Sequence, residues 1–202
     1  IFIMQLIRYH HRHEIDERKW DNCVHNAVNR SVYACSWYLD VVASNWGALI
    51  YKDYELVFPI IFKNFFFFKK IYQPLFCQQL GPFSKNQNLL KSKTIILEIL
   101  LLLQKNNKKF QFSINHCCTD IFKDIINTHE LGLNYLTRIN LNLDLDFPYT
   151  SIYANYNNNT KRNLKSCSDF SMRKIDINDF LLFYKSNIIS AANLNFFHYK
   201  KI

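Results

Sequence analysis

The sequence predicts a mixed α/β fold in which helices cover a twisted sheet. Its 202 residues are 49% hydrophobic and 16% aromatic, which is enough apolar material for a packed core. Glycine occurs only 3 times and proline 4 times, which excludes a linker or a low-complexity protein. Helical and strand patterns alternate along the second half, as they do where helices cover a sheet. The length fits one domain, or one domain and part of a second.

The first half predicts two helices followed by a meander of strands. Apolar residues recur at helical spacing over 14–26, where Asp16 is a candidate N-cap. A second short helix is expected over 33–42. Strands are expected over 48–51 and 56–62, joined by a hairpin turn.

Proline limits the strands of this meander. Pro59 lies within the second strand, which is therefore bulged there or lies at an edge of the sheet. A further strand region over 66–76 is interrupted by Pro74.

The second half predicts alternating helices and strands. The cleanest alternation runs over 139–145, where isoleucine or leucine at every odd position alternates with asparagine or aspartate. Pro148 ends this strand and opens the next helix. Helices are expected over 88–106, 121–129, 149–167 and 177–189, and strands over 110–114, 139–145 and 172–175.

Gly81 stands between an aromatic strand region and a long apolar helix. Glycine at such a junction allows a positive φ or the close approach of a ligand. The start of the following helix offers unpaired N–H groups and a positive dipole end, which suit an anion. On this motif alone, a tight turn without a ligand is the simpler interpretation.

The formal net charge of +9 favours anionic partners such as nucleotides, tRNA, anionic lipid or phosphorylated precursors. The basic residues are scattered, and no block is long enough to act as a nucleic-acid arm. Specific DNA binding is therefore not expected. A solvated basic surface is the simpler explanation, and RNA binding without catalysis would rest on the charge alone.

Six cysteines occur without a C-x-x-C pair and without a secretory signal, which predicts reduced thiols in a cytoplasmic protein. The run His116-Cys117-Cys118 suggests metal binding, but no second ligand pair is spaced to complete a tetrahedron. We therefore expect no metal site. The apolar run 95–103 is too short to cross a membrane, so no transmembrane helix is expected.

Four segments carry a resemblance to a known family. The segments 32–42, 53–59, 72–84 and 159–165 read VYACSWYLDVV, DYELVFP, YQPLFCQQLGPFS and NTKRNLK. In this order and spacing they resemble the Fem-type branch of the GNAT (acyl-CoA N-acyltransferase) superfamily, in particular the FemAB-like proteins of Bacteroidetes. The resemblance spans nearly the whole chain.

The resemblance implies a GNAT-like mixed twisted sheet flanked by helices. Fem-type proteins contain two such domains, with the reaction cleft between them. We expect residues 1–12 to be a ragged N-terminus and 13–176 to form the first domain. Residues 177–202 would begin the helical connection to a second domain that this chain lacks. A fragment of this kind can fold and still be inactive, because the second domain carries much of the donor site.

The resemblance also implies the transfer of an acyl or aminoacyl group to an amine. The donor would be acyl-CoA or aminoacyl-tRNA, which acts as a co-substrate and not as a tightly bound cofactor. Such an enzyme works mainly by positioning, with a base for the amine proton and donors for the oxyanion. No Ser-His-Asp or Cys-His arrangement is evident in the sequence, and direct attack by the amine requires none. The alternative is a non-catalytic half that binds a substrate or a partner subunit.

Candidate binding residues follow from the matched segments. Gln78 and Gly81, with Gln79 between them, match the outline of the GNAT pyrophosphate loop, Gln/Arg-x-x-Gly-x-Gly/Ala. Phe83 takes the last position and would crowd a pyrophosphate if it faced inward. In the fourth segment Lys161 and Arg162 are candidate phosphate contacts, with a solvated helix face as the alternative.

Three further residues near these segments have an apolar body and a polar tip, which suits a cleft. They are Tyr38, Tyr72 and Gln73. Aromatic residues at helical spacing are more often part of a core, so the alternative is packing. Asp40 is a candidate general base, with a capping or structural role as its alternative.

Overall fold

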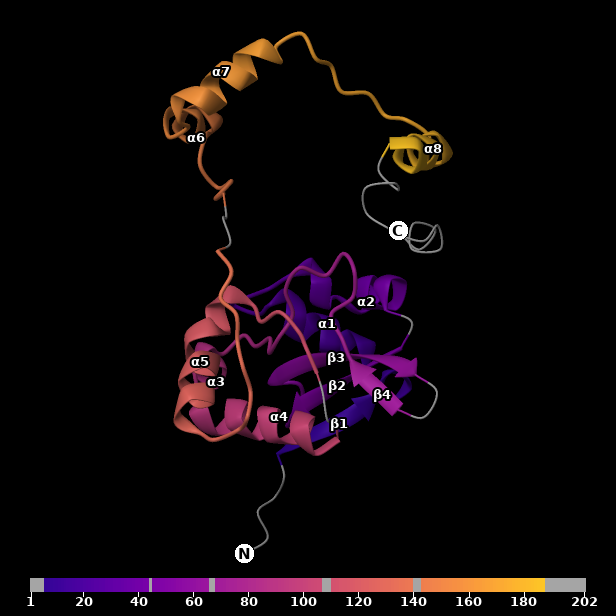
Figure 1. Cartoon of the computed structure of the whole chain (residues 1–202), viewed down its shortest axis with the longest axis vertical. Coiled ribbons are helices and arrows are strands. Elements are labelled where there is room, and N and C mark those ends of the chain that lie inside the picture. Colours follow the sequence, from indigo (N-terminus) through magenta and orange to yellow (C-terminus); the bar gives the residue numbers. More distant parts are fainter. Residues whose placement is uncertain (1–5, 44, 66–67, 107–109, 140–142, 188–202) are drawn as a thin grey trace, which may run out of the picture. The chain divides into compact units, whose positions relative to one another are not determined.

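The computed structural model describes residues 6–43, 45–65, 68–106, 110–139 and 143–187. Contacts divide the chain into two compact units, the first ending at Leu136 and the second beginning at Thr137. Figure 1 shows the first as a sheet with helices and the second as helices joined by extended chain. The division falls inside the range 13–176 that the sequence analysis assigns to one domain.

The first unit is built on a four-stranded antiparallel sheet whose strands follow in sequence order. They are β1 (Ile7–His11), β2 (Trp46–Tyr51), β3 (Leu56–Phe65) and β4 (Phe68–Ile71). Tyr51 pairs with Ile7 on one side and with Leu56 on the other, so β2 and β3 form the expected hairpin. Strand β1 begins at residue 7, inside the segment expected to be ragged. The mixed α/β class is thereby confirmed.

Pro59 lies where β3 has a neighbouring strand on only one side. The N–H and the C=O of Val57 both bond with Phe83, so the alternate residue Pro59 also faces away from β2. Pairing between β3 and β4 begins only at Phe62. Because the missing N–H of proline points away from the β2 ladder, it costs no hydrogen bond, and the expectation of a local edge is confirmed.

Helices cover both faces of this sheet, as the complete burial of β2 requires (Figure 1). On one face, Ala48 and Ile50 pack with α1 and α2; on the other, Leu49 and Tyr51 pack with α3, α4 and α5. The helices are α1 (Glu17–His25), α2 (Ser36–Val42), α3 (Gln87–Leu90), α4 (Lys93–Asn106) and α5 (Thr119–Thr128). Short 3-10 turns are η1 (Arg12–Glu14), η2 (Val32–Ala34) and η3 (His116–Cys118).

Local side-chain bonds determine where these helices begin. Asp16 accepts a hydrogen bond from the N–H of Lys19 at 3.1 Å, so the predicted N-cap of α1 is confirmed. The indole N–H of the fully buried Trp20 donates to the carbonyl of Ala34 at 2.8 Å, which joins α1 to η2. The range 88–106, expected to be one helix, divides into α3 and α4. The hydroxyl of Ser92 accepts from the N–H of Ile95 and starts the second helix.

The expected strand over 110–114 is present only as two parallel bridges, Ile71 to Phe110 and Leu80 to Ile114. Residues 72–79 lie between the bridges on one side, whereas only residues 111–113 lie between them on the other. The longer segment therefore leaves its partner as the loop 72–79 and returns to it, and we call this interruption of the pairing the splay. Helix α4 lies between the two bridged segments along the chain.

The second unit contains α6 (Tyr149–Ala154), α7 (Asn158–Ser166) and α8 (Ile177–Asn187). The helix expected over 149–167 is interrupted because the side chain of Asn157 caps a new helix at the N–H of Thr160. Positions 188 and 189 of the last expected helix lie outside the described residues. Within the described residues, no helix is long and apolar enough to cross a membrane.

The strands expected over 139–145 and 172–175 are wrong for the positions that the structure describes. Residues 139, 143–145 and 172–175 have no strand assignment, and positions 140–142 lie outside the described residues. Ile139 is 92% exposed and Leu145 is 73% exposed. An alternating segment becomes a strand only when a neighbour supplies ladder hydrogen bonds, and no described strand pairs with it.

Candidate functional site

The segment around Gly81 is held on both sides by backbone hydrogen bonds. The N–H of Leu80 donates to Ser113 at 2.8 Å, and the carbonyl of Leu80 accepts from Asn115 at 2.6 Å. Phe83 exchanges two hydrogen bonds with Val57 on β3. Gly81 lies between these hydrogen bonds with φ +132°, a backbone conformation that residues other than glycine rarely adopt. The expectation of a positive φ at this junction is confirmed.

The helix starts that follow Gly81 already have side-chain partners. Ser84 is fully buried, accepts from the N–H of Asn86 at 3.0 Å and donates to the carbonyl of Glu55 at 2.6 Å. Asn86 in turn accepts from the N–H of Asn88 at 2.9 Å. Phe83 is fully buried in the core under α1 and α2 and does not face a ligand. These contacts favour a structural turn over an anion site at this junction.

Three of the predicted site residues form hydrogen bonds at the loop 72–79. The Gln73 side chain donates to the Cys77 carbonyl at 2.7 Å and accepts from the N–H of Ser113 at 3.2 Å, which spans the splay. The Tyr38 hydroxyl donates to the Phe76 carbonyl at 2.8 Å. The Gln79 side chain accepts from the N–H of His116 at 3.4 Å.

The other two predicted residues of this loop region differ in their surroundings. Tyr72 packs beside the core cluster under α1 and α2, whereas Gln78 is exposed. Burial, with Cys77 nearby, raises the pKa of the Tyr38 phenol, so this hydroxyl stays protonated at neutral pH.

Asp40 is held in an ion pair. Its two carboxylate oxygens accept from Nε and Nη2 of Arg12 at 2.8 and 2.7 Å, and Oδ1 also accepts from the Trp46 indole at 2.8 Å. The Arg12 bonds hold the pKa of Asp40 below its usual range. A carboxylate stabilised in this way is a weak base, so these contacts favour the structural alternative for Asp40.

Lys161 and Arg162 lie on α7, in the second unit. The Lys161 ammonium donates to the Ala154 carbonyl at 2.9 Å and lies 5.6 Å from the centre of the Tyr153 ring. The Arg162 guanidinium donates to the Asn159 side chain at 2.8 Å. These two residues therefore belong to a different compact unit from the loop 72–79.

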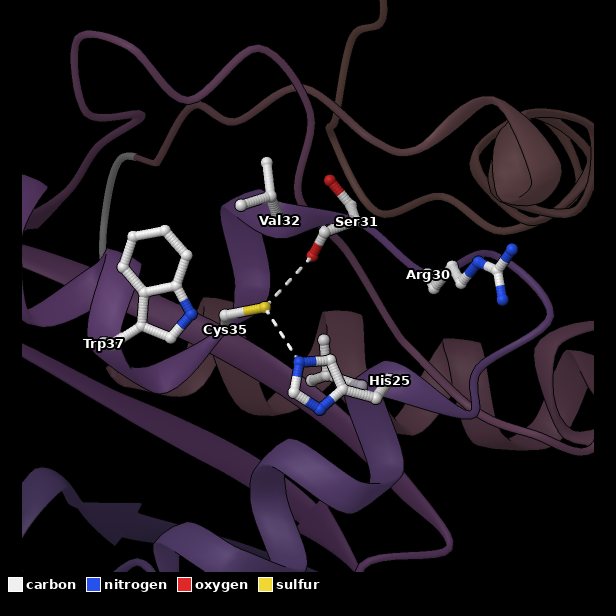
Figure 2. Close-up of a pocket in the computed structure, with 7 residues that line it drawn as sticks. His25, Arg30, Ser31, Val32, Cys35 and Trp37 are labelled. Atoms are coloured by element: carbon white, nitrogen blue, oxygen red, sulfur yellow. Dashed lines mark hydrogen bonds between the residues drawn. The ribbon is translucent and has the colours of Figure 1, made fainter. Parts of the chain in front are cut away.

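The structure also contains a Cys–His pair that the sequence analysis missed. Sγ of Cys35 lies 3.6 Å from Nε2 of His25, in an open cleft of about 370 Å³ between α1 and the start of α2 (Figure 2). The lining residues are Val24, His25, Arg30, Ser31, Val32, Cys35 and Trp37. The two partners come from different helices, so no contiguous motif reveals them.

The spacing of Asp21 and His25 in the sequence places both on the face of α1 that meets the start of α2. Asp21 and His25 lie one turn apart on α1, and their partners Ser36 and Cys35 are neighbours. Asp21 accepts from the N–H of Ser36 at 2.8 Å and from its hydroxyl at 2.5 Å. Two adjacent contacts therefore join the same face of α1 to the start of α2.

The remaining thiols differ in burial. Cys23, Cys77 and Cys118 are buried, and burial raises their pKa values to about 11, 12 and 12 respectively. Cys117 is exposed and lies 3.3 Å from the neighbouring His116 ring. No group of three metal-binding side chains occurs in the part of the chain that the structure describes.

Comparisons with protein-family models, with curated proteins and with solved structures find no significant match to this chain. The candidate sites therefore depend on the contacts within the chain itself. Two places emerge from these contacts: the splay beside the loop 72–79, and the cleft that contains Cys35 and His25.

Proposed function

We propose that the chain is a GNAT-like half of a Fem-type N-acyltransferase. It transfers an acyl or aminoacyl group from a CoA thioester or an aminoacyl-tRNA to an amine in the cytoplasm. The order of the four matched segments supports this proposal, as does the net charge of +9, which suits a polyanionic donor. An antiparallel meander followed by a helix and a parallel segment is consistent with the GNAT-like fold.

The observation that carries the proposal is the splay between Ile71–Phe110 and Leu80–Ile114. A thioester needs backbone donors and acceptors, and we propose that residues 72–79 and 111–113, which form no ladder with each other between the bridges, supply them. The Gln73 side-chain amide bonds with Cys77 and with Ser113 between the two bridges. The hydroxyl of Tyr38, on α2, bonds to the Phe76 carbonyl in the loop. The donor is therefore proposed to bind beside residues 73–81.

The reaction at this place would be direct attack of the amine on the thioester. The domain lowers the barrier mainly by holding both substrates in position. The proton lost by the amine is taken up by the leaving thiolate, and Tyr38, whose hydroxyl donates to the Phe76 carbonyl, is a proposed positioning residue for the loop. In the second unit, Lys161 and Arg162 are proposed contacts for a phosphate group bound on α7 itself, because each presents a cation there.

The test is the thermal unfolding of the purified chain with CoA or with acetyl-CoA. A ligand that binds only the folded state stabilises it by about 2.7 kcal/mol at a hundredfold excess over its Kd. We expect a higher midpoint with acetyl-CoA, which Gln79→Ala reduces and which the exposed control Lys91→Ala leaves unchanged. No shift with CoA, acetyl-CoA or aminoacyl-tRNA would contradict the proposal.

A second candidate function is a binding half without catalysis. The ion pair of Asp40 and the capped helix starts after Gly81 favour it, because they leave that carboxylate and those N–H groups already engaged. The two candidates differ in turnover. A catalytic half releases CoA from acetyl-CoA faster when an amine is added, whereas a binding half shows the thermal shift alone.

A further inference from the structure

The Cys35–His25 cleft has features of a reactive site beyond those used in direct amine attack. The thiol and the imidazole come from different elements and are in contact at 3.6 Å. Figure 2 shows Sγ between the His25 ring and the Ser31 carbonyl, with Trp37 and Arg30 on opposite sides of the pair. A nucleophile and a base in contact at an open cleft are the minimum for covalent acyl transfer.

The position of the thiol is fixed by its neighbours. The Asp21 carboxylate holds both the N–H and the hydroxyl of Ser36, the residue next to Cys35. His25 lies one turn beyond Asp21 on the same helix, so its ring reaches the thiol from that anchored face. The pair therefore joins the end of α1 to the N-cap of α2.

The thiol needs a base to react. Cys35 is only 5% exposed, and its burial, with the nearby charge of Asp21, raises the pKa of the thiol. At neutral pH the sulfur therefore carries its proton. His25 Nε2 at 3.6 Å can accept that proton when the other ring nitrogen carries the hydrogen, and Ser31 O at 3.9 Å is the competing acceptor.

The cleft offers apolar walls beside this pair. Trp37 is 56% exposed and Val32 is 47% exposed, although both are large apolar side chains, and both line the cleft. Its volume of about 370 Å³ is in the range of small-molecule sites. A short acyl chain would cover these two side chains and remove their apolar surface from water.

We propose that Cys35 accepts an acyl group from a thioester, with His25 as its base and with Trp37 and Val32 in contact with the acyl chain. This inference rests on the proposed function in one respect, the identity of the natural acyl donor. It adds a second route, of two steps through a Cys35 thioester, whose residues are separate from the donor site proposed beside residues 73–81.

The two steps balance without a redox change. In the first, Sγ of Cys35 bonds to the acyl carbon, the donor's carbon–sulfur bond breaks, and the thiol proton passes through His25 to the leaving thiolate. In the second, the amine nitrogen bonds to the acyl carbon and the bond from that carbon to Sγ breaks. The amine proton returns through His25 to Cys35.

The test is the acylation of Cys35 by S-phenyl thioacetate, a donor that needs no CoA site. Peptide mass spectrometry compares the acetylation of Cys35 with that of Cys117, which touches His116 at 3.3 Å but is exposed. Iodoacetamide labelling of the same two thiols corrects for accessibility. We expect the Cys35 to Cys117 ratio to be at least about tenfold higher with the thioester than with iodoacetamide.

Three variants make the test specific. His25→Gln should lower this ratio to the iodoacetamide value while His116→Gln leaves the Cys35 rate unchanged, and thermal unfolding checks that both variants fold. The wild type should react faster at Cys35 with a hexanoyl than with an acetyl thioester, and Trp37→Ala should abolish this preference. Equal ratios for the two reagents, or a ratio that His25→Gln does not change, would overturn the proposal.

The donor is tested separately with acetyl-CoA. Labelling of Cys35 by both S-phenyl thioacetate and acetyl-CoA supports the pair and the proposed function together. Labelling by S-phenyl thioacetate alone supports the pair but argues against CoA as the donor. A thermal shift with acetyl-CoA in the absence of any Cys35 thioester would overturn the covalent route and leave direct attack.

Discussion

Arg12 and Asp40 form a two-point ion pair, with guanidinium to carboxylate distances of 2.8 and 2.7 Å. Arg12 belongs to the turn after β1, and Asp40 belongs to α2. Trp46 joins them, because its indole N–H donates to Asp40 and its ring lies 5.1 Å from the guanidinium carbon. The pair therefore connects the sheet edge to the helix that also carries Cys35 at its N-cap.

Replacement of Asp40 by Asn should destabilise the protein by about 1 kcal/mol at neutral pH, measured by urea denaturation. The loss is modest because the Asp40 side chain is 43% exposed and solvent screens part of the attraction. The matched control is Glu17→Gln. This change removes the other carboxylate that contacts Arg12, at a side chain 60% exposed, and should cost less than about 0.5 kcal/mol.

The same pair predicts a pH dependence. The pKa of Asp40 is lowered in the folded state, so its contribution is present above its unfolded pKa of about 4 and is lost as the pH falls further. The difference in unfolding free energy between the wild type and Asp40→Asn should be constant above about pH 5 and shrink below about pH 4. A difference that grows in acid would contradict the ion pair.

Replacement of Gln73 by Leu should cost about 1–2 kcal/mol of unfolding free energy. The change leaves the Cys77 carbonyl and the Ser113 N–H without the amide that now bonds with both across the splay. The exposed neighbour Gln78 provides the control, because Gln78→Leu should change stability by less than about 0.5 kcal/mol. Equal effects of the two changes would show that the side-chain bridge does not hold the splay.

Replacement of Gly47 by Ala should destabilise the protein through a clash with β1. A Cβ at this position would lie 2.6 Å from the His10 carbonyl oxygen and would also meet the Tyr9 ring. A side chain can rotate away, but the backbone oxygen moves only if β1 shifts, so we expect a loss of about 1–3 kcal/mol in urea denaturation. Removal of the Tyr9 ring in Tyr9→Ala/Gly47→Ala should not restore stability. Full rescue would show that the ring alone causes the clash.

Sequence patterns predicted the features of this fold that depend on neighbours along the chain. The Asp16 cap and the hairpin after Tyr51 were predictable, because each is determined within a few residues. The Cys35–His25 contact was not predictable, because it depends on how α1 packs against α2. The Phe83 side chain was expected at a ligand loop, but its backbone bonds with Val57 turn it into the core.

The apolar residues at 139–145 also show the limit of a period-two pattern. An alternation of apolar and polar residues predicts which face of a strand would be apolar. It does not predict whether a second strand is present to pair with that segment. Ile139 and Leu145 are exposed in the structure, whereas Ile99 of α4 is fully buried. Because the three side chains are of similar size, their replacement by alanine shows how burial alone changes the loss of unfolding free energy.

Ile139→Ala and Leu145→Ala, singly and together, should each change the unfolding free energy by less than about 0.5 kcal/mol, because little apolar surface is lost from a core. Ile99→Ala, which deletes the same kind of side chain from the core, should cost about 2–5 kcal/mol. Urea denaturation followed by circular dichroism measures all four variants. A loss above about 1 kcal/mol in the double variant would mean that these side chains are packed in solution, as the alternation predicts for a paired strand.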